Sequence, residues 1–360
     1  MFITDVYNTR SIAAYTTQAY SNRIPFLGEA YFPNKKKMGI DLAWIKTHKG
    51  LGVALKPSNY DAIPTVRPRG KAQKTKEEML LYRESMVIKE HDLMELSRIK
   101  DSDDPYLQPV IDSMYDDTRN LVEGAEISAE RMRMNLLAPT NGDMQIVVPL
   151  ADNTNAIYDY DPDGTWKSTN YLELTGADTW DNPTAKPLND IRKAVQYLAS
   201  IGVTATDILG NSTTFDYLLE NEQIKNALIS ISGQTINFID EDTAKEVLRR
   251  KMGLARTTYD KMFEDYDSTQ KKFYPDNYVT ILGSGQLGNT WRGTTPEELT
   301  TIGNFMNIPQ APVDITVLES GIAVAVQSEY KPSFTVTTTA SQIVLPSFEG
   351  MDSIFVIKVK

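Results

Sequence analysis

The 360-residue sequence contains no cysteine and only two histidines, His48 and His91. The lack of cysteine excludes a disulfide framework, a thiolate nucleophile and a Cys-based metal site. Two histidines are too few for most multi-histidine sites, and neither has a serine or carboxylate partner in a recognisable pattern. Both are simply explained as solvated side chains. We therefore predict a protein that is not an enzyme and that uses no cofactor and no metal.

Long apolar runs are also absent. No stretch approaches the 18 or more apolar residues that a membrane-spanning helix needs, and the short run 322–326 has the length of a strand. Asp5 and Arg10 interrupt any apolar core near the N-terminus, so the first residues do not resemble a secretory signal. We expect a soluble intracellular protein without a membrane partner.

Positive charge is scarce over most of the chain and concentrated near its beginning. The formal net charge is −11, from 37 Lys and Arg against 48 Asp and Glu. Residues 1–100 carry a net charge of +7, whereas the other 260 residues carry −18. Most of the positive excess lies in residues 23–76, which hold 12 basic and 3 acidic side chains.

Three interpretations of this basic stretch remain open. It could be a solvated hairpin or loop. It could bind nucleic acid, because Lys and Arg displace counterions from phosphates, although the acidic remainder would repel a polyanion and aromatic stacking residues are few. It could also serve self-association, with a basic arm lying over an acidic neighbouring subunit.

The first 76 residues have little capacity to fold alone. Residues 1–22 are polar and lack a sustained period, which is typical of an arm that needs an external surface. Short alternating strands are expected at 38–42 and 51–55, around a turn at 46–50. A two-stranded ribbon of this kind has too little apolar surface to be stable by itself.

Two helices are expected next. Beginning at Lys76, the apolar residues Met79, Tyr82, Met86, Leu93 and Leu96 predict one helical face. A capping acid and a proline at 104–105 begin a second helix, which continues to 138–139. At 1.5 Å per residue this second helix would be roughly 50 Å long, with Gly124 as its weak point.

The rest of the chain alternates between strands and helices. Strands are expected at 144–149 and 155–160, followed by a turn at 161–164. The next elements are a helix at 188–200, a strand at 203–209, a cap at Asn211 and a helix at 215–228. A strand at 234–239, a helix at 243–252 and a strand at 278–282 follow. Three tail strands are expected at 314–326, 341–345 and 353–360.

The sharpest motif is Gly283, Gly285 and Gly288, which fits G-x-G-x-x-G after an expected strand. A dinucleotide fingerprint also needs a helix that begins at the third glycine. Gly293 and Pro296 would break such a helix, so a tight loop without ligand is favoured. Residues 295–298 are instead typical of a helix start. The Asp-rich sets at 101–104 and 159–163 favour caps and turns over a cation site.

Taken in order, several segments resemble the major capsid proteins of tailed bacteriophages, with the greatest similarity to the lambda major head protein family, capsid protein E. These segments are FLGEAYFPN at 26–34, IDLAW at 40–44, VALKP at 53–57, LGSGQLGNTW at 282–291 and TTPEE at 294–298. The weight of the resemblance comes from the order of the segments, which extends over nearly the whole chain.

The resemblance implies an α+β fold of the Hong Kong 97 type. Residues 1–25 would be the N-terminal arm, and residues 26–76 the extended loop across a neighbouring subunit. Residues 77–175 would form the peripheral domain with its long spine helix, residues 176–325 the axial domain, and residues 326–360 the returning strands of the peripheral domain.

The implied function is that of a major capsid protein which assembles into pentamers and hexamers of an icosahedral shell around double-stranded DNA. A scaffold protein and a portal would be partners, with a head-decoration protein as a further candidate and packaged DNA bound only non-specifically. The protein would be found in the virion after assembly in the host cytoplasm. The alternatives are a dinucleotide-binding enzyme using residues 283–288 and a nucleic-acid-binding module using residues 23–76.

The extended loop supplies the predicted inter-subunit contacts, and the three glycines would lie in an axial-domain loop. The predicted contact residues are Lys35, Lys36, Lys37, Trp44, Lys46, Lys49, Arg67 and Arg69. Some relatives join a loop lysine to an asparagine of the next subunit. We do not predict that chemistry here, because no asparagine and glutamate partners can be identified.

Overall fold

The computed structural model describes residues 26–46, 73–91, 94, 107–150, 154–232, 241–265, 267–302, 313–318, 320–330 and 334–360. The chain divides into two compact units, each made from segments that are distant in sequence. Unit 1 comprises Met1–Leu42, Glu77–Glu130 and Asn289–Ser347. Unit 2 comprises Ala43–Lys76, Arg131–Gly288 and Phe348–Lys360.

Unit 1 is built on a largely antiparallel sheet. In the described residues its order is β1 (Asn34–Lys36), β13 (Asn289–Arg292), β16 (Phe334–Ser347), β15 (Ala323–Tyr330) and β14 (Val313–Val317). Strand β4 (Leu81–Ile88) also pairs with β16. The first part of β16 lies between β15 and β4, and its last four residues pair with β13. The long strand β16 therefore organises this sheet.

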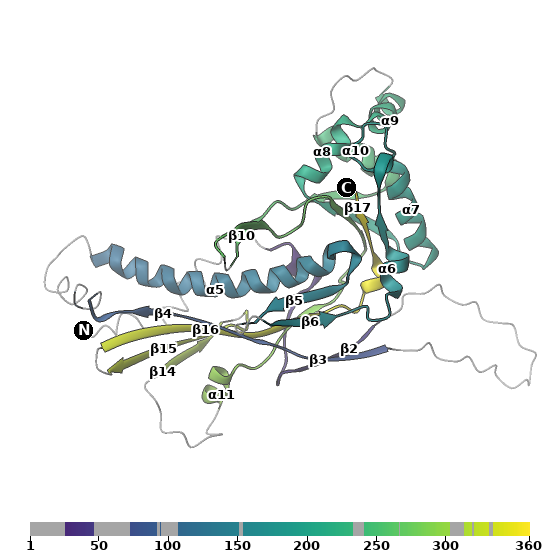
Figure 1. The fold of residues 1–360 in the computed structure, drawn as a ribbon. Helices are drawn as coiled ribbons and strands as arrows, with labels where there is room; N and C mark the ends of the chain where they lie inside the picture. Colours follow the sequence, from purple (N-terminus) through teal and green to yellow (C-terminus); the bar gives the residue numbers. More distant parts are fainter. Residues whose placement is uncertain are drawn as a thin grey trace, which may run out of the picture. The chain divides into compact units, whose positions relative to one another are not determined.

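Helix α5 (Leu107–Leu137) has 31 residues and is about 46 Å long at 1.5 Å per residue. Figure 1 shows it running along the β4, β16 and β15 strands. Its residues Leu121 and Val122 are buried in a cluster with Ile322, Val324 and Val336. The long helix predicted to end at 138–139 is confirmed, although its expected start at 104–105 lies outside the described residues.

The helix predicted from Lys76 is wrong, because residues 81–88 form β4. Tyr82 and Met86 are four residues apart, a spacing that suits both a helical face and alternate positions of a strand. Burial that alternates from one residue to the next identifies the strand, since Ile88 is buried whereas the adjacent Val87 is exposed. The pairing partners lie at 336–343, about 250 residues further along the chain, where local periodicity does not reveal them.

The expected ribbon is only partly as predicted. Strand β2 (Asp41–Lys46) pairs with β3 (Gln73–Glu78) in a two-stranded sheet. The strand begins at Asp41 rather than at residue 38, because residues 38–40 form a bend in which Gly39 has a φ of +85°. The second expected strand, 51–55, lies outside the described residues.

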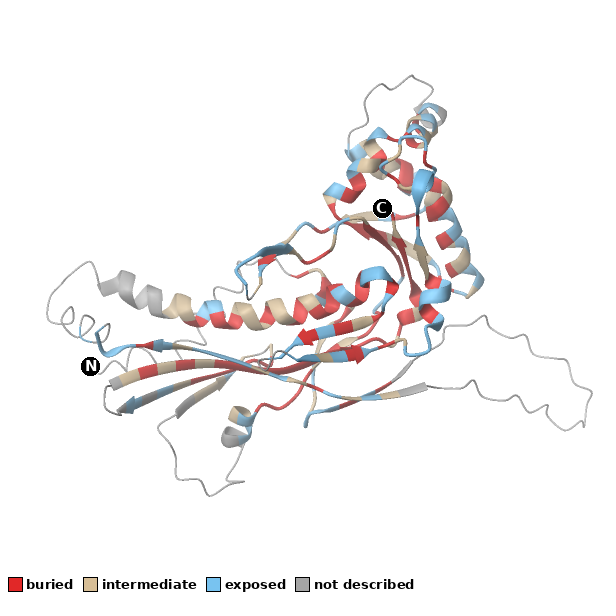
Figure 2. Cartoon of the chain, viewed as in Figure 1, coloured by how far each residue is buried: buried red, intermediate tan, exposed pale blue. Residues whose placement is uncertain are grey.

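Unit 2 contains a mixed sheet surrounded by helices. Within the described residues its order is β7 (Tyr171–Glu173), β17 (Ile354–Lys358), β12 (Tyr278–Gly283), β8 (Ala205–Gly210) and β9 (Ala255–Thr258). The packing helices are α7 (Pro187–Ser200), α8 (Ser212–Glu220), α9 (Glu222–Ser232) and α10 (Glu241–Met252). Figure 2 shows the buried sheet beneath them, and β12 is buried along its whole length.

Several predictions for unit 2 are confirmed. The helices expected at 188–200 and 243–252 are α7 and α10, and the strands expected at 203–209 and 278–282 are β8 and β12. The single helix expected at 215–228 is wrong, because the backbone is extended at Asn221. The Asn221 side chain accepts hydrogen bonds from the N–H groups of Gln223 and Ile224, and so caps α9. The strand expected at 234–239 lies outside the described residues.

Two hairpins and two short helices also belong to unit 2. The predicted strands near 145–160 are β5 (Gln145–Pro149) and β6 (Asn155–Asp159), which pair with each other. A second hairpin, β10 (Met262–Glu264) and β11 (Gln270–Lys272), was not predicted. Helix α6 is Thr165–Asn170, and the 3-10 helix η2 is Gly176–Asp178.

The remaining elements are three short helical segments and the strands after residue 313. These segments are α3 (Gly28–Tyr31), α11 (Pro296–Ile302) and the 3-10 turn η1 (Thr140–Gly142). The strand predicted at 314–326 is in fact the two strands β14 and β15, with Gly321 at φ +83° in the turn between them. The strands predicted at 341–345 and 353–360 correspond to part of β16 and to β17, which follows the 3-10 turn η3 (Met351–Ser353).

Candidate assembly surfaces

The three consecutive lysines of the predicted loop lie on and just after β1, which pairs in parallel with β13. The Lys36 ammonium lies 2.5 Å from the Glu298 carboxylate and donates to the Gly293 carbonyl at 3.2 Å. Lys37 donates to the Asp41 carbonyl at 2.7 Å. Lys35 is exposed, with its ammonium 5.8 Å from the centroid of the Trp291 ring. Lys35 is therefore the best placed of the three to meet another molecule.

Trp44 lies on β2 and is packed within unit 2. Its side chain is only 5% exposed, and its ring centroid is 5.4 Å from that of Tyr160. Lys46 is the last residue of β2. The remaining predicted contact residues, Lys49, Arg67 and Arg69, lie outside the described residues. Among the predicted contact residues that the structure describes, Lys35 and Lys36 therefore share β1, with Lys37 directly after it, and Trp44 and Lys46 share β2.

The glycine motif forms a loop between two strands. Gly283 ends β12, and Gly288 directly precedes β13. The chain therefore has no helix at the place where a dinucleotide fingerprint requires a helix N-terminus. A Cβ atom at Gly283 would lie 2.5 Å from Cγ1 of Val203, and Gly285 has a φ of +97°. Packing and backbone conformation thus explain these two glycines.

A buried ion pair connects α5 to the sheet of unit 1. Arg292 on β13 is 1% exposed, and its Nη2 lies 2.9 Å from the Glu126 carboxylate of α5. Its Nη1 donates to Gln342 on β16, whose amide donates to the Ala125 carbonyl at 2.6 Å. Sequence reasoning missed this site. The available signal was one acid, Glu126, inside the predicted apolar face of the helix.

Helix α11 contributes two further carboxylates to unit 1. Its first turn begins as predicted, since the Glu298 N–H donates to the Thr295 hydroxyl at 3.3 Å. Glu297 accepts hydrogen bonds from Arg83 on β4 and from the Ser341 hydroxyl on β16, the latter at 2.7 Å. Together with the Lys36 to Glu298 contact, these bonds attach β1, β4 and β16 to one short helix.

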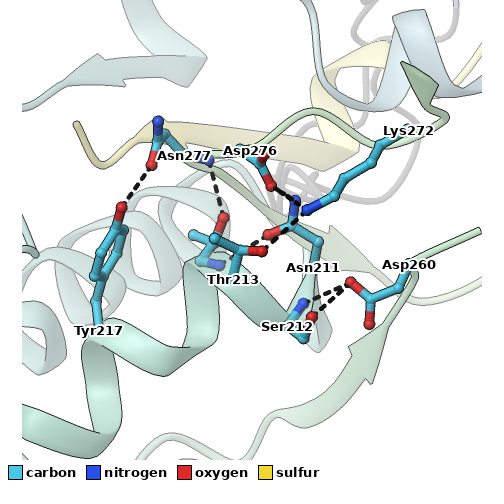
Figure 3. A network of polar contacts seen from close by, with 9 residues as sticks. Asn211, Ser212, Thr213, Tyr217, Asp260, Lys272, Asp276 and Asn277 are labelled. Carbon is cyan, nitrogen blue, oxygen red and sulfur yellow. Dashed lines mark hydrogen bonds and ion pairs between the residues drawn. The ribbon is translucent and has the colours of Figure 1, made fainter. Parts of the chain in front are cut away.

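Figure 3 shows a polar network at one edge of the unit 2 sheet. Asn211 caps α8 as predicted, accepting from the Thr214 N–H at 2.8 Å, and donates to Asp276 at 2.5 Å. Asp260 accepts from both the N–H and the hydroxyl of Ser212. Lys272 lies 2.7 Å from Asp276. These side chains bind one another, so the network fixes the loops after β8 and β9 to the loop before β12.

The second half of this network holds the turn before β12. The Asn277 N–H donates to the Thr214 hydroxyl at 2.9 Å, and the Tyr217 hydroxyl donates to the Asn277 side chain at 3.0 Å (Figure 3). Asn277 has a φ of +67°, a left-handed conformation that asparagine tolerates better than most residues. In the described residues no group of three or more His, Cys, Asp or Glu side chains could hold a metal ion.

Shifted pKa values occur on structural side chains. The hydrogen bond and charge of Glu173 raise the pKa of Lys358. The Lys358 ammonium also lies 3.1 Å from the Asn141 amide oxygen, but a protonated amine has no lone pair with which to attack an amide. Burial raises the pKa of Tyr274, whose hydroxyl contacts Thr280 and the Leu209 carbonyl. These groups stabilise unit 2.

The described helices include none that is both long and apolar enough to span a bilayer. A comparison with curated proteins finds no match. Similar folds do occur among solved structures. The putative capsid protein of a prophage from E. coli CFT073 is 13% identical, with 98% of this chain and 99% of that chain covered and a TM-score of 0.60.

Two further structures have comparable similarity. A phage-related protein from Bordetella bronchiseptica RB50 is 11% identical, with 96% of this chain and 95% of that chain covered and a TM-score of 0.52. The capsid protein of cyanophage A-1(L) is 13% identical, with 93% and 92% covered and a TM-score of 0.50. At such identities the similarity concerns the fold, and it confirms the α+β fold of Hong Kong 97-type phage capsid proteins.

A model of one protein family aligns with most of the sequence and agrees with this fold. It describes phage major capsid protein E and matches residues 8–332. Because that match covers nearly the whole chain, the protein belongs to the phage major capsid protein E family, and its role is to form the shell of the virion.

Proposed function

We propose that copies of this chain assemble into the pentamers and hexamers of an icosahedral phage head that encloses double-stranded DNA. The match of the capsid family model over residues 8–332 carries this proposal. The role is structural rather than catalytic. The polar clusters described above agree with this, because their side chains are engaged with one another and hold loops and strands in place.

In this proposal residues 26–76, which make up most of the basic stretch 23–76, form an extended loop that lies over a neighbouring subunit. The arm is 1–25, the peripheral domain is 77–175 with the returning strands 326–360, and the axial domain is 176–325. The charge distribution supports the loop assignment, since residues 23–76 hold 12 basic and 3 acidic side chains whereas the whole chain has a net charge of −11. A basic loop and an acidic neighbour attract each other.

The same charge distribution bears on the other partners. A net charge of −11 disfavours strong binding to DNA, so packaged DNA would be held by confinement and only non-specifically. A scaffold protein, a portal and a head-decoration protein are the further partners that we propose. Assembly would take place in the host cytoplasm.

Lys35→Glu tests the loop assignment, because Lys35 is exposed whereas Lys36 and Lys37 bind their own subunit. We expect the variant to fold normally and to assemble about tenfold more slowly at low salt, since the substitution replaces attraction with repulsion. Light scattering would measure the rate. At about 0.5 M salt the difference should shrink, because screening weakens exposed charges.

The matched control is Lys186→Glu, which makes the same change at an exposed lysine directly before α7, outside the basic stretch. This control should assemble at nearly the wild-type rate. If Lys35→Glu assembles as fast as the wild type, or if both variants slow assembly equally, the basic stretch has no specific role in joining subunits.

A further inference from the structure

Asn141 is followed by Gly142, and this is the one Asn-Gly pair in the 360-residue sequence. Asparagine is a thermolabile residue. Its side-chain amide can be attacked by the backbone nitrogen of the next residue, and glycine shields that nitrogen least because it has no Cβ. Asn141 is exposed to water, whereas Gly142 is buried. The pair therefore places the residue types most prone to deamidation at the surface of unit 2.

The turn η1 requires these two residue types. Asn141 has a φ of +53° and Gly142 has a φ of +78°, so both lie in the left-handed region. Glycine and asparagine adopt that region at the lowest cost. An added Cβ at Gly142 would also lie 2.7 Å from the Tyr171 ring. Substitution by less reactive residues would therefore strain the turn, so the local structure depends on a chemically labile pair.

The folded turn holds Asn141 in a conformation that cannot react. Deamidation proceeds through a succinimide ring, and closing that ring requires the Gly142 nitrogen to lie on the same side as the Cβ atom of Asn141. With a ψ of +23° at Asn141, the nitrogen lies nearly opposite Cβ around the Cα–C bond. The Gly142 N–H also donates to the Pro139 carbonyl at 3.1 Å, which opposes rotation of this bond. Reaction therefore requires the turn to open.

Two further contacts anchor Asn141 to the sheet of unit 2. Its N–H donates to the Tyr278 hydroxyl at 3.0 Å, and its side-chain oxygen accepts from the Lys358 ammonium at 3.1 Å. The Lys358 ammonium in turn lies 2.8 Å from the Glu173 carboxylate. Tyr278 and Lys358 are opposite each other on the paired strands β12 and β17. Both the backbone and the side chain of Asn141 are thus attached to the core of the unit.

We propose that Asn141 is a modification site that the fold protects: it deamidates in the unfolded chain and is preserved once the turn has formed. The Gly142 nitrogen loses its proton to solvent and bonds to Cγ of Asn141, while the side-chain nitrogen takes up a proton and leaves as ammonia. Water then opens the succinimide at either carbonyl and gives aspartate or isoaspartate. Each event consumes one water and releases one ammonia.

The isoaspartate product makes the modification selective against unfolded chains. Isoaspartate adds one atom to the backbone path of the turn. The turn has no room for that atom, because the Gly142 N–H closes it onto Pro139 and Gly142 packs against Tyr171. A chain modified in this way should not refold to the original stability of unit 2. The reaction thereby removes chains that stay unfolded for long from the folded population.

Mass spectrometry of the full chain, incubated at mildly alkaline pH, tests the proposal. In denaturing guanidinium chloride, Asn141 should convert to both isoaspartate and aspartate. In folded subunits the conversion should be at least about 30-fold slower, because its rate follows the population of the open turn. Equal rates in the two states would show that the fold does not protect Asn141. No conversion in denaturant, or aspartate without isoaspartate, would overturn the assigned reaction.

Lys358→Met supplies an independent readout. The substitution removes the hydrogen bond to the side-chain oxygen of Asn141, so the turn should open more often. Deamidation of folded subunits should become about fivefold faster, whereas the rate in denaturant should not change. If the rate in folded subunits does not change either, the contact with Lys358 does not protect Asn141, and this part of the inference fails.

Lys360→Met is the matched control, because Lys360 lies two residues further along and pairs with Asp181, at 3.1 Å, rather than with Asn141. It should leave both rates as they are in the wild type. Equal acceleration by the two substitutions would assign the effect to a general loss of stability and contradict a specific role for the Lys358 contact.

Discussion

At the scale of single residues, the unusual feature of unit 1 is a charged pair inside its core. Arg292 is 1% exposed and the side chain of Glu126 is 6% exposed, and they lie 2.9 Å apart. A buried ion pair need not stabilise more than an apolar pair would, but it strongly penalises the loss of either partner. The pair therefore fixes the position of α5 on the sheet.

Glu126→Ala should lower the free energy of unfolding by about 3–5 kcal/mol, because it leaves the Arg292 guanidinium buried without its counter-charge. Urea unfolding of the unassembled subunit measures this change. Asp116→Ala is the matched control, since the Asp116 to Arg119 pair on the same helix is 45% exposed at both residues; it should change stability by less than about 0.5 kcal/mol. Equal effects of the two substitutions would show that the buried pair has no special role.

Asp117 on α5 should make stability depend on pH. Burial, and to a lesser degree the neighbouring Asp116, raise the pKa of Asp117. Folding therefore favours the protonated form, and the stability due to this group is lost as pH rises from about 3.9, the usual pKa of an unfolded Asp, through the folded pKa. In urea unfolding, Asp117→Asn should become more stable relative to the wild type as pH rises through this window.

Asp267→Asn should show the opposite pH dependence: its stability relative to the wild type should fall as pH rises. Hydrogen bonds, chiefly from the Thr269 hydroxyl, lower the pKa of Asp267. The wild type therefore gains stability from this group as pH rises, and loses it as pH falls through the folded pKa. If the free energy of unfolding, relative to the wild type, changed with pH in the same direction for both variants, the environments assigned to Asp117 and Asp267 would be contradicted.

Local residue roles could be predicted from the sequence where the partner is close along the chain. The cap at Asn211 and the helix start at Thr295 each involve a residue three positions away. The Glu126 to Arg292 pair joins residues 166 positions apart, so no local pattern reveals it. For the same reason the sequence could not show that Lys36 binds Glu298, 262 positions away.

At the scale of elements, α5 and β4 show what a periodic pattern can and cannot predict. The apolar spacing of α5 continues over many turns, so its helical period is unambiguous. The pattern around β4 is short, and positions four apart fit both a helix and a strand. Pairing with β16 resolves the ambiguity, and that pairing depends on the far end of the chain.

Gly124 in the middle of α5 offers a direct test of this element. An added Cβ would find only the Glu84 carboxylate, at 3.9 Å, which is an ordinary contact. Gly124→Ala should therefore raise the free energy of unfolding by about 0.5–1 kcal/mol, because alanine loses less backbone entropy on helix formation.

Gly293→Ala is the contrasting substitution in the same unit. Its Cβ would lie 2.6 Å from Cγ2 of Ile343 and 2.9 Å from the Gly39 carbonyl oxygen. Overpacking of this kind should destabilise unit 1 by about 1–3 kcal/mol. Thermal unfolding of both variants measures these changes, with a higher Tm expected for Gly124→Ala and a lower Tm for Gly293→Ala. A lower Tm for Gly124→Ala would show that α5 is more tightly packed at this position than the structure indicates.

At the scale of the whole molecule, the distribution of charge is more informative than its sum. The net value of −11 conceals a stretch, 23–76, with 12 basic and 3 acidic side chains. The resemblance carried by the order of segments predicted both the fold and the family, and both are confirmed. The assignment of particular lysines to subunit contacts remains a prediction, because contacts between copies are not a property of one chain.

The central claim is that this chain builds a shell from copies of itself, and electron microscopy of the purified full-length protein tests it most directly. The account predicts shells, tubes or capsomers, either from the protein alone or with its scaffold protein. A chain that stays a compact monomer at high concentration, forms none of these even with the scaffold protein, and binds a nucleotide would contradict it.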